Sequence, residues 1–577
     1  MRYMQPDLPG KGRCCGNGKR DKKMITLKIN GVVISVPPGT TILAAAGKAA
    51  IFIPTLCYYE GYPHYTSCML CIVEEKKSGK LLPACSAQAA EGMVIETENE
   101  TVRNARRETL ELLLSEHAGD CLPPCRRACP AHFDIPLMIS QIADNALEQA
   151  RQTIQEGIPF PATLGRICPA PCEKVCRRRA FDQPVAICSL KQLAGDYMLE
   201  QPAPVFPVPV LKQKIAIVGA GAAGLSAAFY LMKQGYPCTV FDKQDKPGGK
   251  LYSSVPAGNL DPDILQREIA AYLPHMEFRM KLTIGKDLSL AMLRSDYSAV
   301  ILAPGELNHR TASFFPVAFS SYGITVNPTG SVSGYRGLFA GGAAVKPTKL
   351  AVSAVAHGKQ IAREVHKYLS GPEAESNTEE FLSVLGTLSE SETAELVQGA
   401  AGYDRIRPAG GNALTLEEGR REAGRCLHCE CYKVSSCALR KYSLDYKARP
   451  HAFSPSTRPQ VVRRRLPGGI VFEEGKCIKC GICVRITAAS GQGMTFLHRG
   501  YNARVDTPFI SLSGDIWEKY GALCAAACPT GAISLPGVIS VKAREGGEIE
   551  NDKYQNDTSD AGNVLIVPGI PRGRPSG

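Results

Sequence analysis

The stretch KIAIVGAGAAGLSAAFYLMKQGYPCTVFDK, residues 214–243, constrains the fold more than any other part of this chain. An apolar run leads into a glycine turn, a helical pattern follows the turn, and a second apolar run ends the stretch. The pattern predicts a strand over residues 214–218, a helix to about Gln234 and a second strand ending at Asp242. This order of elements indicates the first β-α-β unit of a Rossmann-type domain.

The glycines of this stretch fit a nucleotide-binding turn. Gly219 permits the tight turn, Gly221 lets the backbone approach a pyrophosphate, and Gly224 lets the helix pack closely on the strand. The helix N-terminus would offer free N–H groups and a positive dipole to the phosphates. Asp242 is placed to accept a hydrogen bond from an adenosine ribose hydroxyl. An ordinary glycine-rich turn is the alternative, but strand, helix and acid in register favour a dinucleotide.

Length and composition leave a multidomain protein without a membrane span. The chain has 577 residues, 44% of them hydrophobic, and no apolar run approaches the roughly 18 residues that a spanning helix needs. The first 23 residues are basic and glycine-rich without an apolar core, so they do not predict a secretory signal. The net charge of +12 is dispersed, with its densest run at Arg463–Arg465. We expect a cytoplasmic protein with a solvated basic surface, open to an acidic partner protein, and no nucleic-acid site.

Cysteine usage indicates metal chemistry. The chain has 23 cysteines, and most of them fall into short-spaced groups. Without a secretory signal the expected compartment is reducing, which argues against a disulfide framework. Clustered cysteines in such a compartment bind either zinc or iron–sulfur clusters.

Motifs and changes of composition divide the chain into a multidomain α/β and α+β arrangement. We expect a disordered basic extension (1–23), a [2Fe-2S] ferredoxin-like domain (24–100), a helical domain with two [4Fe-4S] clusters (101–200), a proline-rich linker (201–213), a FAD-binding Rossmann-type domain (214–370), an acidic linker carrying solvated helix (371–413), a cysteine-rich [4Fe-4S] segment (414–450), a ferredoxin-like [4Fe-4S] domain (465–540) and a flexible tail (541–577).

The N-terminal domain begins with a predicted strand hairpin and a helix start at Thr40 or Thr41. Its cysteines are spaced C-x10-C-x2-C-x13-C, which suits a [2Fe-2S] cluster better than zinc, whose ligands more often form two close pairs. The sequence IPTLCYYEGYPHYTSCMLCIVE resembles the β-grasp ferredoxin-like domain of the large iron–sulfur subunit of complex I, which also heads NAD-linked hydrogenases and formate dehydrogenases. The expected ligands are Cys57, Cys68, Cys71 and Cys85.

An amphipathic helix over residues 102–116 precedes HAGDCLPPCRRACPAHFDIP, GRICPAPCEKVCRRR and VAICSLKQLAGDY. These motifs resemble the N-terminal domain of the glutamate synthase small subunit, shared with dihydropyrimidine dehydrogenase and the ferredoxin:NADP bifurcating transhydrogenases. The resemblance implies one [4Fe-4S] cluster on Cys121, Cys125 and Cys176, and another on Cys129, Cys168 and Cys172. Candidates for the fourth ligands are His117, with a surface histidine as the alternative, and Cys188, with a small buried core residue as the alternative.

Two later motifs resemble the flavin-binding segments of the same family. These are KPGGKL (Lys246–Leu251) and GLFAGGAAV (Gly337–Val345), the latter followed by a helical stretch from Ala351 to Val365. The family's second motif carries an aspartate where this chain has Ala343. The family also inserts an NADPH-binding domain between the two motifs, and this sequence has no second strand–glycine–helix pattern there. The resemblance implies FAD at Gly219, Ala220, Gly221, Ala223, Gly224, Asp242, Lys243, Gly248, Gly249, Lys250, Leu251, Gly341, Gly342 and Ala343.

Two further cysteine groups lie near the C-terminus. The motif RCLHCECYKVSSCALR predicts a [4Fe-4S] cluster, with a single zinc ion as the alternative and His428 as a bystander. The motif EGKCIKCGICVRIT, with a remote Cys-Pro, resembles a bacterial ferredoxin in which Thr487 replaces a ligand of the second cluster and Cys524 is vestigial. The expected ligands of the two sites are Cys426, Cys429, Cys431 and Cys437, and then Cys477, Cys480, Cys483 and Cys528.

One [2Fe-2S] cluster, about four [4Fe-4S] clusters and one FAD would make the chain an electron-transfer subunit of a larger oxidoreductase. The expected partners are an NADH-binding flavoprotein, a hydrogenase-type or formate dehydrogenase-type subunit, or a ferredoxin, in a hetero-oligomer. No residue stands out as a general acid or base. The alternatives are a self-sufficient NAD(P)H-dependent flavin reductase or ferredoxin oxidoreductase, and a cluster-carrying scaffold with a decayed flavin site.

Overall fold

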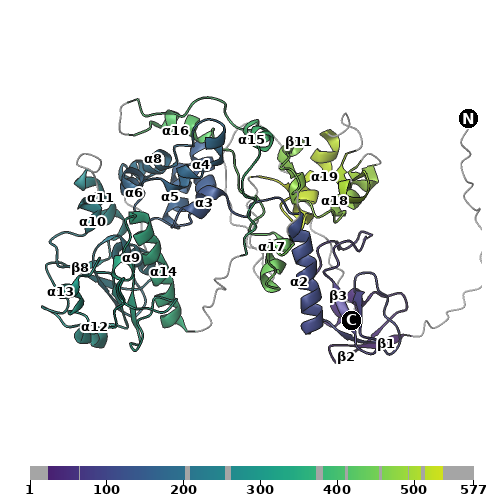
Figure 1. Ribbon diagram of the computed structural model, residues 1–577, viewed down its shortest axis with the longest axis horizontal. Helices are drawn as coiled ribbons and strands as arrows, with labels where there is room; N and C mark the ends of the chain where they lie inside the picture. Colours follow the sequence, from purple (N-terminus) through teal and green to yellow (C-terminus); the bar gives the residue numbers. More distant parts are fainter. Residues whose placement is uncertain are drawn as a thin grey trace, which may run out of the picture. The chain divides into compact units, whose positions relative to one another are not determined.

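The computed structural model describes residues 24–63, 65–201, 208–253, 261–371, 381–409, 413–453, 458–490, 493–507 and 514–536. The N-terminal extension with Cys14 and Cys15, the C-terminal tail and residues 202–207 of the proline-rich linker lie outside these ranges. Residues 24–536 belong to one compact unit, and many of its elements are labelled in Figure 1.

The N-terminal region is a five-stranded mixed sheet in the order β2-β1-β5-β3-β4. The predicted hairpin is present as an antiparallel pair of strands, and the helix after it begins where expected, with Thr41 as its N-cap. Leucine, isoleucine and valine side chains from one face of the sheet and from the helix form the core. The elements are β1 (Ile25–Ile29), β2 (Val32–Val36), α1 (Ile42–Lys48), β3 (Ile72–Glu75), β4 (Lys80–Pro83) and β5 (Val94–Glu96).

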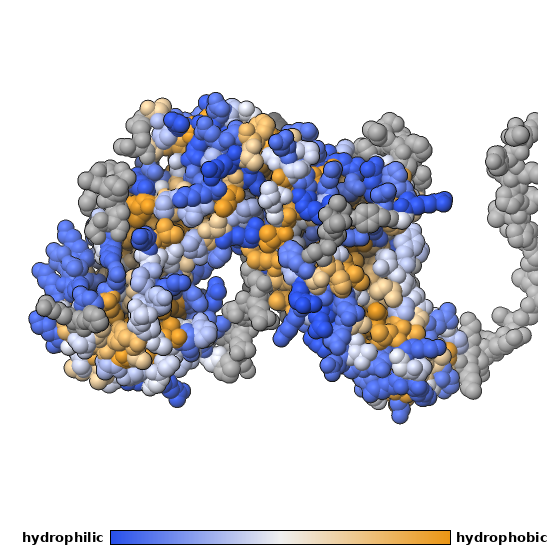
Figure 2. Space-filling view, in the orientation of Figure 1, coloured by the Kyte–Doolittle hydropathy of each residue, from blue (hydrophilic) through white to orange (hydrophobic). Residues whose placement is uncertain are grey.

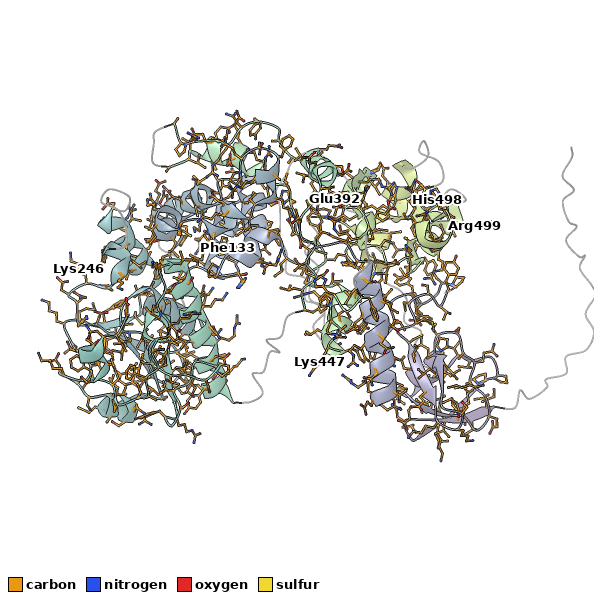
Figure 3. The ribbon with its side chains drawn as sticks, in the orientation of Figure 1. Phe133, Lys246, Glu392, Lys447, His498 and Arg499 are labelled. Atoms are coloured by element: carbon orange, nitrogen blue, oxygen red, sulfur yellow. The ribbon has the colours of Figure 1, made fainter. Side chains whose placement is uncertain are left out.

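The next region is helical. Proline occupies the first turn of several of its short helices, where the missing N–H costs no hydrogen bond. Phe133, labelled in Figure 3, lies in the apolar core that these helices share. The helices are α2 (Glu100–Ser115), α3 (Pro124–Ala128), α4 (Ile135–Ala143), α5 (Leu147–Gln155), α6 (Pro161–Ile167), α7 (Pro171–Lys174) and α8 (Ile187–Leu199), with a 3₁₀ turn at Arg177–Ala180.

The predicted Rossmann-type unit is a five-stranded, fully parallel sheet in the order β10-β9-β6-β7-β8. Helices α9 and α14 pack against each other beside it (Figure 1). Residues 303–337 lie between β9 and β10, and they contain no second dinucleotide-binding sheet. The elements are β6 (Ile215–Val218), α9 (Ala222–Lys233), β7 (Cys238–Phe241), α10 (Lys250–Ser253), α11 (Pro262–Tyr272), β8 (Glu277–Arg279), α12 (Leu290–Asp296), β9 (Ala299–Leu302), α13 (His309–Ala312), β10 (Leu338–Ala340) and α14 (Ala351–Ser370).

The C-terminal region holds a three-stranded sheet, β11-β12-β15, and a separate two-stranded pair, β13-β14. Helices and loops connect these strands, and most of the cysteines of the region lie in the loops. The elements are α15 (Glu390–Val397), α16 (Leu416–Ala423), α17 (Ala438–Asp445), β11 (Arg463–Leu466), β12 (Ile470–Glu473), α18 (Ile482–Thr487), β13 (Thr495–Leu497), β14 (Arg504–Asp506), α19 (Gly514–Ala527) and β15 (Ile533–Ser534).

The expectation of a solvated linker over residues 371–413 is wrong for the described residues 381–409. Leu396 of α15 is buried in an apolar cluster with Leu427 and Val461. Glu392, labelled in Figure 3, forms an ion pair with Arg458 and accepts a hydrogen bond from the N–H of Val461 at 2.9 Å. The Glu392 carboxylate therefore takes part in a buried contact, because its basic partner Arg458 lies far along the chain.

Figure 2 shows polar side chains over much of the visible face, with apolar residues interspersed among them. Over the parts of the chain that the structure describes, every helix falls short of the length and apolarity required to cross a bilayer.

Candidate dinucleotide and iron–sulfur sites

Of the three motif glycines at the turn between β6 and α9, Gly221 alone has open space beside it, at the position where a phosphate would bind. A Cβ atom on Gly224 would lie 1.9 Å from the carbonyl oxygen of Gly219, so helix and strand are packed too closely for a side chain. Gly219 has a φ of +109°, a conformation that favours glycine. In contrast, a Cβ atom on Gly221 would have no heavy-atom neighbour within 4 Å. The space above Gly221 fits the approach of a pyrophosphate.

Asp242 lies at the end of β7, next to the turn. One of its carboxylate oxygens accepts from the N–H of Ala220 at 2.6 Å, and the other accepts from Gln244 N at 2.8 Å. The carboxylate therefore braces the nucleotide turn itself, a role that sequence reasoning missed. Each oxygen keeps lone-pair capacity for the expected ribose hydroxyl.

The two expected flavin motifs both reach this turn. Gly248 N donates to Ala220 O at 2.8 Å, and a Cβ on Gly249 would lie 3.1 Å from the Cα of Gly221. From the other motif, a Cβ on Gly342 would lie 2.8 Å from the Cβ of Ala223. Of the remaining expected residues, Leu251 is buried and Lys250 forms an exposed ion pair with Glu306. In sequence, Gly341 and Ala343 adjoin Gly342, and Lys243 adjoins Asp242. Lys246 of the first motif is labelled in Figure 3.

The N-terminal cysteine group comprises Cys57, Cys68, Cys71 and Cys85, all buried. The Cys57 side chain contacts those of Cys68 and Cys85, and the Cys71 side chain contacts that of Cys85. Hydrogen bonding by Cys85 lowers the pKa of the Cys71 thiol to about 7. The four sulfurs predicted as one ligand set are therefore brought together.

The helical-domain cysteine group comprises Cys129, Cys168, Cys172 and Cys188. The Cys188 side chain contacts those of Cys168 and Cys172, and Cys129 lies close enough to Cys168 for their charges to interact. Cys188, one of the two candidates for a missing fourth ligand, thus joins the three cysteines that the family resemblance grouped.

A buried lysine, which sequence reasoning also missed, faces this group. Lys191 is 3% exposed, and its ammonium donates to the sulfur of Cys188 at 3.8 Å. Burial lowers the pKa of this ammonium, but the four nearby cysteines outweigh burial and raise the pKa above its ordinary value. A buried ammonium whose neighbours are cysteine sulfurs fits a site of thiolates bound to metal, because neutral thiols would leave the charge uncompensated.

The other cysteines group differently from the sequence prediction, which placed Cys121 with Cys125 and Cys176. Cys125 and Cys176 instead line a small cavity with Cys426 and Cys429, and we call these four residues the shared cysteine group. Cys121 lies near Cys431, and Cys437 lies near both. The grouping differs from the prediction because residues 426–437 fold onto the helical region. The cysteines of this one sequence motif therefore face two different places.

Cys121, Cys431 and Cys437 form a three-cysteine group. The Cys121 sulfur accepts from Ser383 N at 3.3 Å, and the Cys437 sulfur lies 3.8 Å from Pro529 O. Near this group, the Nδ1 atom of His117 is buried without a hydrogen-bond partner. Burial, with Lys476 nearby, lowers the pKa of His117 to about 4, so the ring is neutral at pH 7. His428, expected as a bystander, pairs with Glu430 at 3.1 Å.

The C-terminal cysteine group comprises Cys477, Cys480, Cys483 and Cys528, which line one small cavity together with Cys524. Thr487, at the position of a further ligand in two-cluster ferredoxins, is buried and donates to Cys483 O at 2.8 Å. Thr487 therefore supports the helix that carries Cys483. Cys524, expected as vestigial, is buried beside the group.

Arg485 joins the first group to the last. Its guanidinium donates to Cys57 O at 2.8 Å, to Cys480 O at 3.4 Å and to Gly481 O at 3.0 Å. The side chain is 6% exposed and also lies over the ring of Tyr65. No sequence pattern signalled this contact, because an arginine in a helix of the ferredoxin-like motif is ordinarily a surface residue.

Successive groups are neighbours. Arg485 links the N-terminal and C-terminal groups, and Cys437 lies near Cys528. Asp120, next to Cys121, pairs with Arg177, next to Cys176, at 2.5 Å. Cys125 and Cys176 of the shared group pack against the same apolar core as the helical-domain group. This core also includes Val352 of α14 and contacts Ala222, which begins α9 at the nucleotide turn. The five groups and the turn therefore form one continuous series.

Among the described residues, no three His, Cys, Asp or Glu side chains converge closely enough to hold a single metal ion. In a [4Fe-4S] cluster each cysteine binds a different iron, and in a [2Fe-2S] cluster two cysteines bind each iron, so the four ligands of a cluster lie farther apart than those of one zinc ion.

Three family models match parts of the chain. A 2Fe-2S iron–sulfur cluster binding domain matches residues 22–100, and dihydropyrimidine dehydrogenase domain II with its 4Fe-4S cluster matches residues 97–203. An NAD(P)-binding Rossmann-like domain matches residues 217–276. The chain therefore combines these three kinds of domain in a multidomain α/β architecture, as the sequence predicted.

The resemblance to the glutamate synthase group is confirmed by curated relatives. The NADPH-Fe(3+) oxidoreductase subunit beta of Geobacter sulfurreducens is 37% identical over 38% of this chain and 31% of its own length. The NADP(+)-dependent formate dehydrogenase subunit beta of Moorella thermoacetica is 35% identical over 32% and 29%. The glutamate synthase [NADPH] small chain of Mycobacterium tuberculosis is 34% identical over 32% and 39%. The chain thus spans about a third of the length of these relatives.

Proposed function

We propose that the chain is an electron-transfer subunit of a multisubunit oxidoreductase, with one FAD, one [2Fe-2S] cluster and four [4Fe-4S] clusters. The observation that carries the proposal is the continuous series of cysteine groups, buried or half-buried, that ends at a nucleotide turn. The relatives support it, because they are subunits of an oxidoreductase and of a dehydrogenase. When bound, the flavin exchanges one or two electrons and the clusters exchange one at a time.

The residues of the chain would supply binding, burial and charge. The space above Gly221 would receive the pyrophosphate of FAD, and the N–H groups that begin α9 would face it. Lys191 would offset the negative charge of the cluster on the helical-domain group. The three-cysteine group would take His117 as its fourth ligand, since the buried Nδ1 has no other partner.

The partners would hold the substrate sites. Residues 303–337 contain no second dinucleotide-binding sheet, so nicotinamide would bind on a partner of the NADH-binding flavoprotein, hydrogenase or formate dehydrogenase type, or electrons would pass to a ferredoxin. The cytoplasm is the compartment that suits so many unpaired cysteines.

The test is to purify the whole chain without oxygen, to quantify iron, sulfide and FAD, and then to add NADH or NADPH alone. We expect about eighteen iron atoms, two from the [2Fe-2S] cluster and four from each of four others, and one FAD that neither nucleotide reduces. Rapid bleaching of the flavin by one nucleotide would instead identify a self-sufficient reductase. Clusters without FAD would leave a cluster-carrying scaffold.

A matched pair of variants tests the nucleotide turn. Gly221→Ala should fold normally but lose most of its FAD, because the new methyl group fills the space that the pyrophosphate needs. Gly402→Ala is the control, since its Cβ would also meet nothing within 4 Å but lies away from the turn. Equal FAD content in the two variants would contradict the proposed site.

A further inference from the structure

We infer that one [4Fe-4S] cluster is held by the shared cysteine group, Cys125, Cys176, Cys426 and Cys429. Two of its ligands come from the helical region, and two come from a segment that begins 250 residues after Cys176 (426 − 176). The inference rests on the proposed function in that it takes the cysteine groups to be iron–sulfur sites. It goes further, because it replaces the self-contained cluster expected on Cys426, Cys429, Cys431 and Cys437.

The cavity provides the first argument. All four cysteines line it, and the rest of its lining is mostly proline, isoleucine, leucine and valine. The four cysteine sulfurs are the soft metal ligands in this lining, and iron–sulfur clusters are bound by thiolates. The dry, apolar surroundings would also exclude water from the cluster.

Proximity agrees with the cavity. Cys125 lies close enough to Cys426, Cys429 and Cys176 for their charges to interact. Arg177 and Arg463 lie near Cys429, where their positive charges would offset the negative charge of a bound cluster.

A buried ionic network fixes the remote pair of ligands in place. Arg425, immediately before Cys426, is 0% exposed and contacts Glu422 at 2.9 Å and Asp182 at 3.1 Å. Arg178, also 0% exposed, donates to Arg425 O at 2.7 Å. Glu422 in turn accepts from Ala186 N at 2.8 Å. Four charged side chains thus bind the segment before Cys426 to the turn after Cys176.

The cysteine motif of residues 426–437 is consequently divided between two sites. Its first pair, spaced C-x2-C, faces Cys125 and Cys176, and its second pair faces Cys121. The C-terminal segment therefore completes the N-terminal iron–sulfur site from a distance.

The test compares iron content in serine variants of the whole chain, purified without oxygen. Cys125→Ser and Cys426→Ser should each lose about four iron atoms, and the double variant should lose no more than either single variant. Cys426→Ser combined with Cys437→Ser should lose about eight. Additive loss in the first double variant, or a loss of only four in the second, would overturn the inference. Cys238→Ala, in strand β7 and outside every group, is the control.

A spectroscopic measurement on aspartate variants tests the inference if the serine variants retain iron or fail to accumulate. Cys125→Asp and Cys426→Asp keep a metal ligand and should shift the same [4Fe-4S] resonance in electron paramagnetic resonance spectra, whereas Cys437→Asp should shift a different one. Shifts of two different resonances by Cys125→Asp and Cys426→Asp would refute the shared site. If the unaltered protein holds no iron at all, the proposed function fails instead.

Discussion

The N-terminal and shared cysteine groups are assembled in opposite ways. All four cysteines of the first lie within residues 57–85, where the backbone itself sets their positions, as in the hydrogen bond from Ala84 N to Cys71 O at 3.0 Å. The shared group depends on buried ion pairs between segments that are far apart in sequence. The first site requires one small domain to fold, and the second requires the helical and C-terminal regions to be docked together.

The two sites therefore differ in the substitutions that they tolerate. A local site keeps its geometry as long as its own loop is intact. A site held by charges at 0% exposure loses its geometry when one charge is removed, because the partner is left buried and unpaired.

Removal of the Arg425 guanidinium should produce the largest effect. It should disrupt the shared cysteine group and leave the N-terminal group intact. Arg425→Met leaves the buried Glu422 without its cation, whereas Asp182 keeps its ion pair with Arg178, and we expect a loss of about 3–5 kcal/mol in stability and of about four iron atoms. Circular dichroism of the [2Fe-2S] cluster should remain. Arg421→Met, an exposed arginine of α16, which precedes Arg425, is the control. Loss of the [2Fe-2S] spectrum together with the other iron would show that the two sites are not independent.

Substitution of Arg485 tests the contact between the N-terminal and C-terminal groups. Arg485→Met leaves the carbonyls of Cys57 and Gly481 without their donor, which should cost about 2 kcal/mol in a chemical denaturation experiment. Iron content should not change, but the magnetic interaction between the two reduced clusters should weaken as the loops separate. Arg499→Met, at an exposed position labelled in Figure 3, provides the reference. An unchanged interaction would mean that other contacts hold the loops.

A smaller, purely electrostatic effect is expected at the helical-domain group. Lys191→Met removes the buried charge near four cysteines, so the reduced cluster loses a stabilising cation. Its reduction potential should become more negative, as measured by potentiometric titration with resonance detection, with iron content preserved. Lys174→Met, an exposed lysine on α7, should leave the potential unchanged. Equal potentials in the two variants would exclude the proposed role of Lys191.

The smallest effect concerns the junction between the helical and Rossmann-type regions. Glu268, 0% exposed, accepts from Ala162 N at 2.7 Å and Thr163 N at 2.9 Å at the start of α6. Burial raises its pKa from 4.5 to about 7. The folded protein therefore binds more protons than the unfolded chain between pH 4.5 and 7, and stability should fall as pH rises through this window.

The expected decrease is on the order of 1–2 kcal/mol between pH 5 and pH 8. Thermal unfolding of the whole protein across this range should reveal it. Glu268→Gln, which cannot ionise, should remove this part of the pH dependence, and Glu277→Gln on exposed strand β8 should not. A pH profile that Glu268→Gln leaves unaltered would show that the carboxyl group stays ionised throughout.

Local patterns were sufficient to predict the strand–turn–helix of the dinucleotide turn, the hairpin that begins the first sheet and the proximity of the four N-terminal cysteines. In each case the decisive residues lie within a short stretch, as Gly219, Gly221 and Gly224 do. Cys125 and Cys176 lie together as predicted, but the proximity of Cys426 and Cys429 to them was not predicted, because spacing within a motif cannot reveal a neighbour supplied from elsewhere. Lys191 and Arg485 also escaped prediction, since an isolated basic residue in a helix is ordinarily solvated.

The sequence by itself determined the kinds of domain, the nucleotide turn and the number of cysteines available to bind metal, because strand, turn and spacing patterns act over a few residues. Only the tertiary structure decided which cysteines face one another, which charges are buried beside them and how the groups follow in series. The physical reason is that a ligand set for a cluster is a set of distances in space. For the shared group those distances are set by the docking of two regions, through Arg178, Glu422 and Arg425.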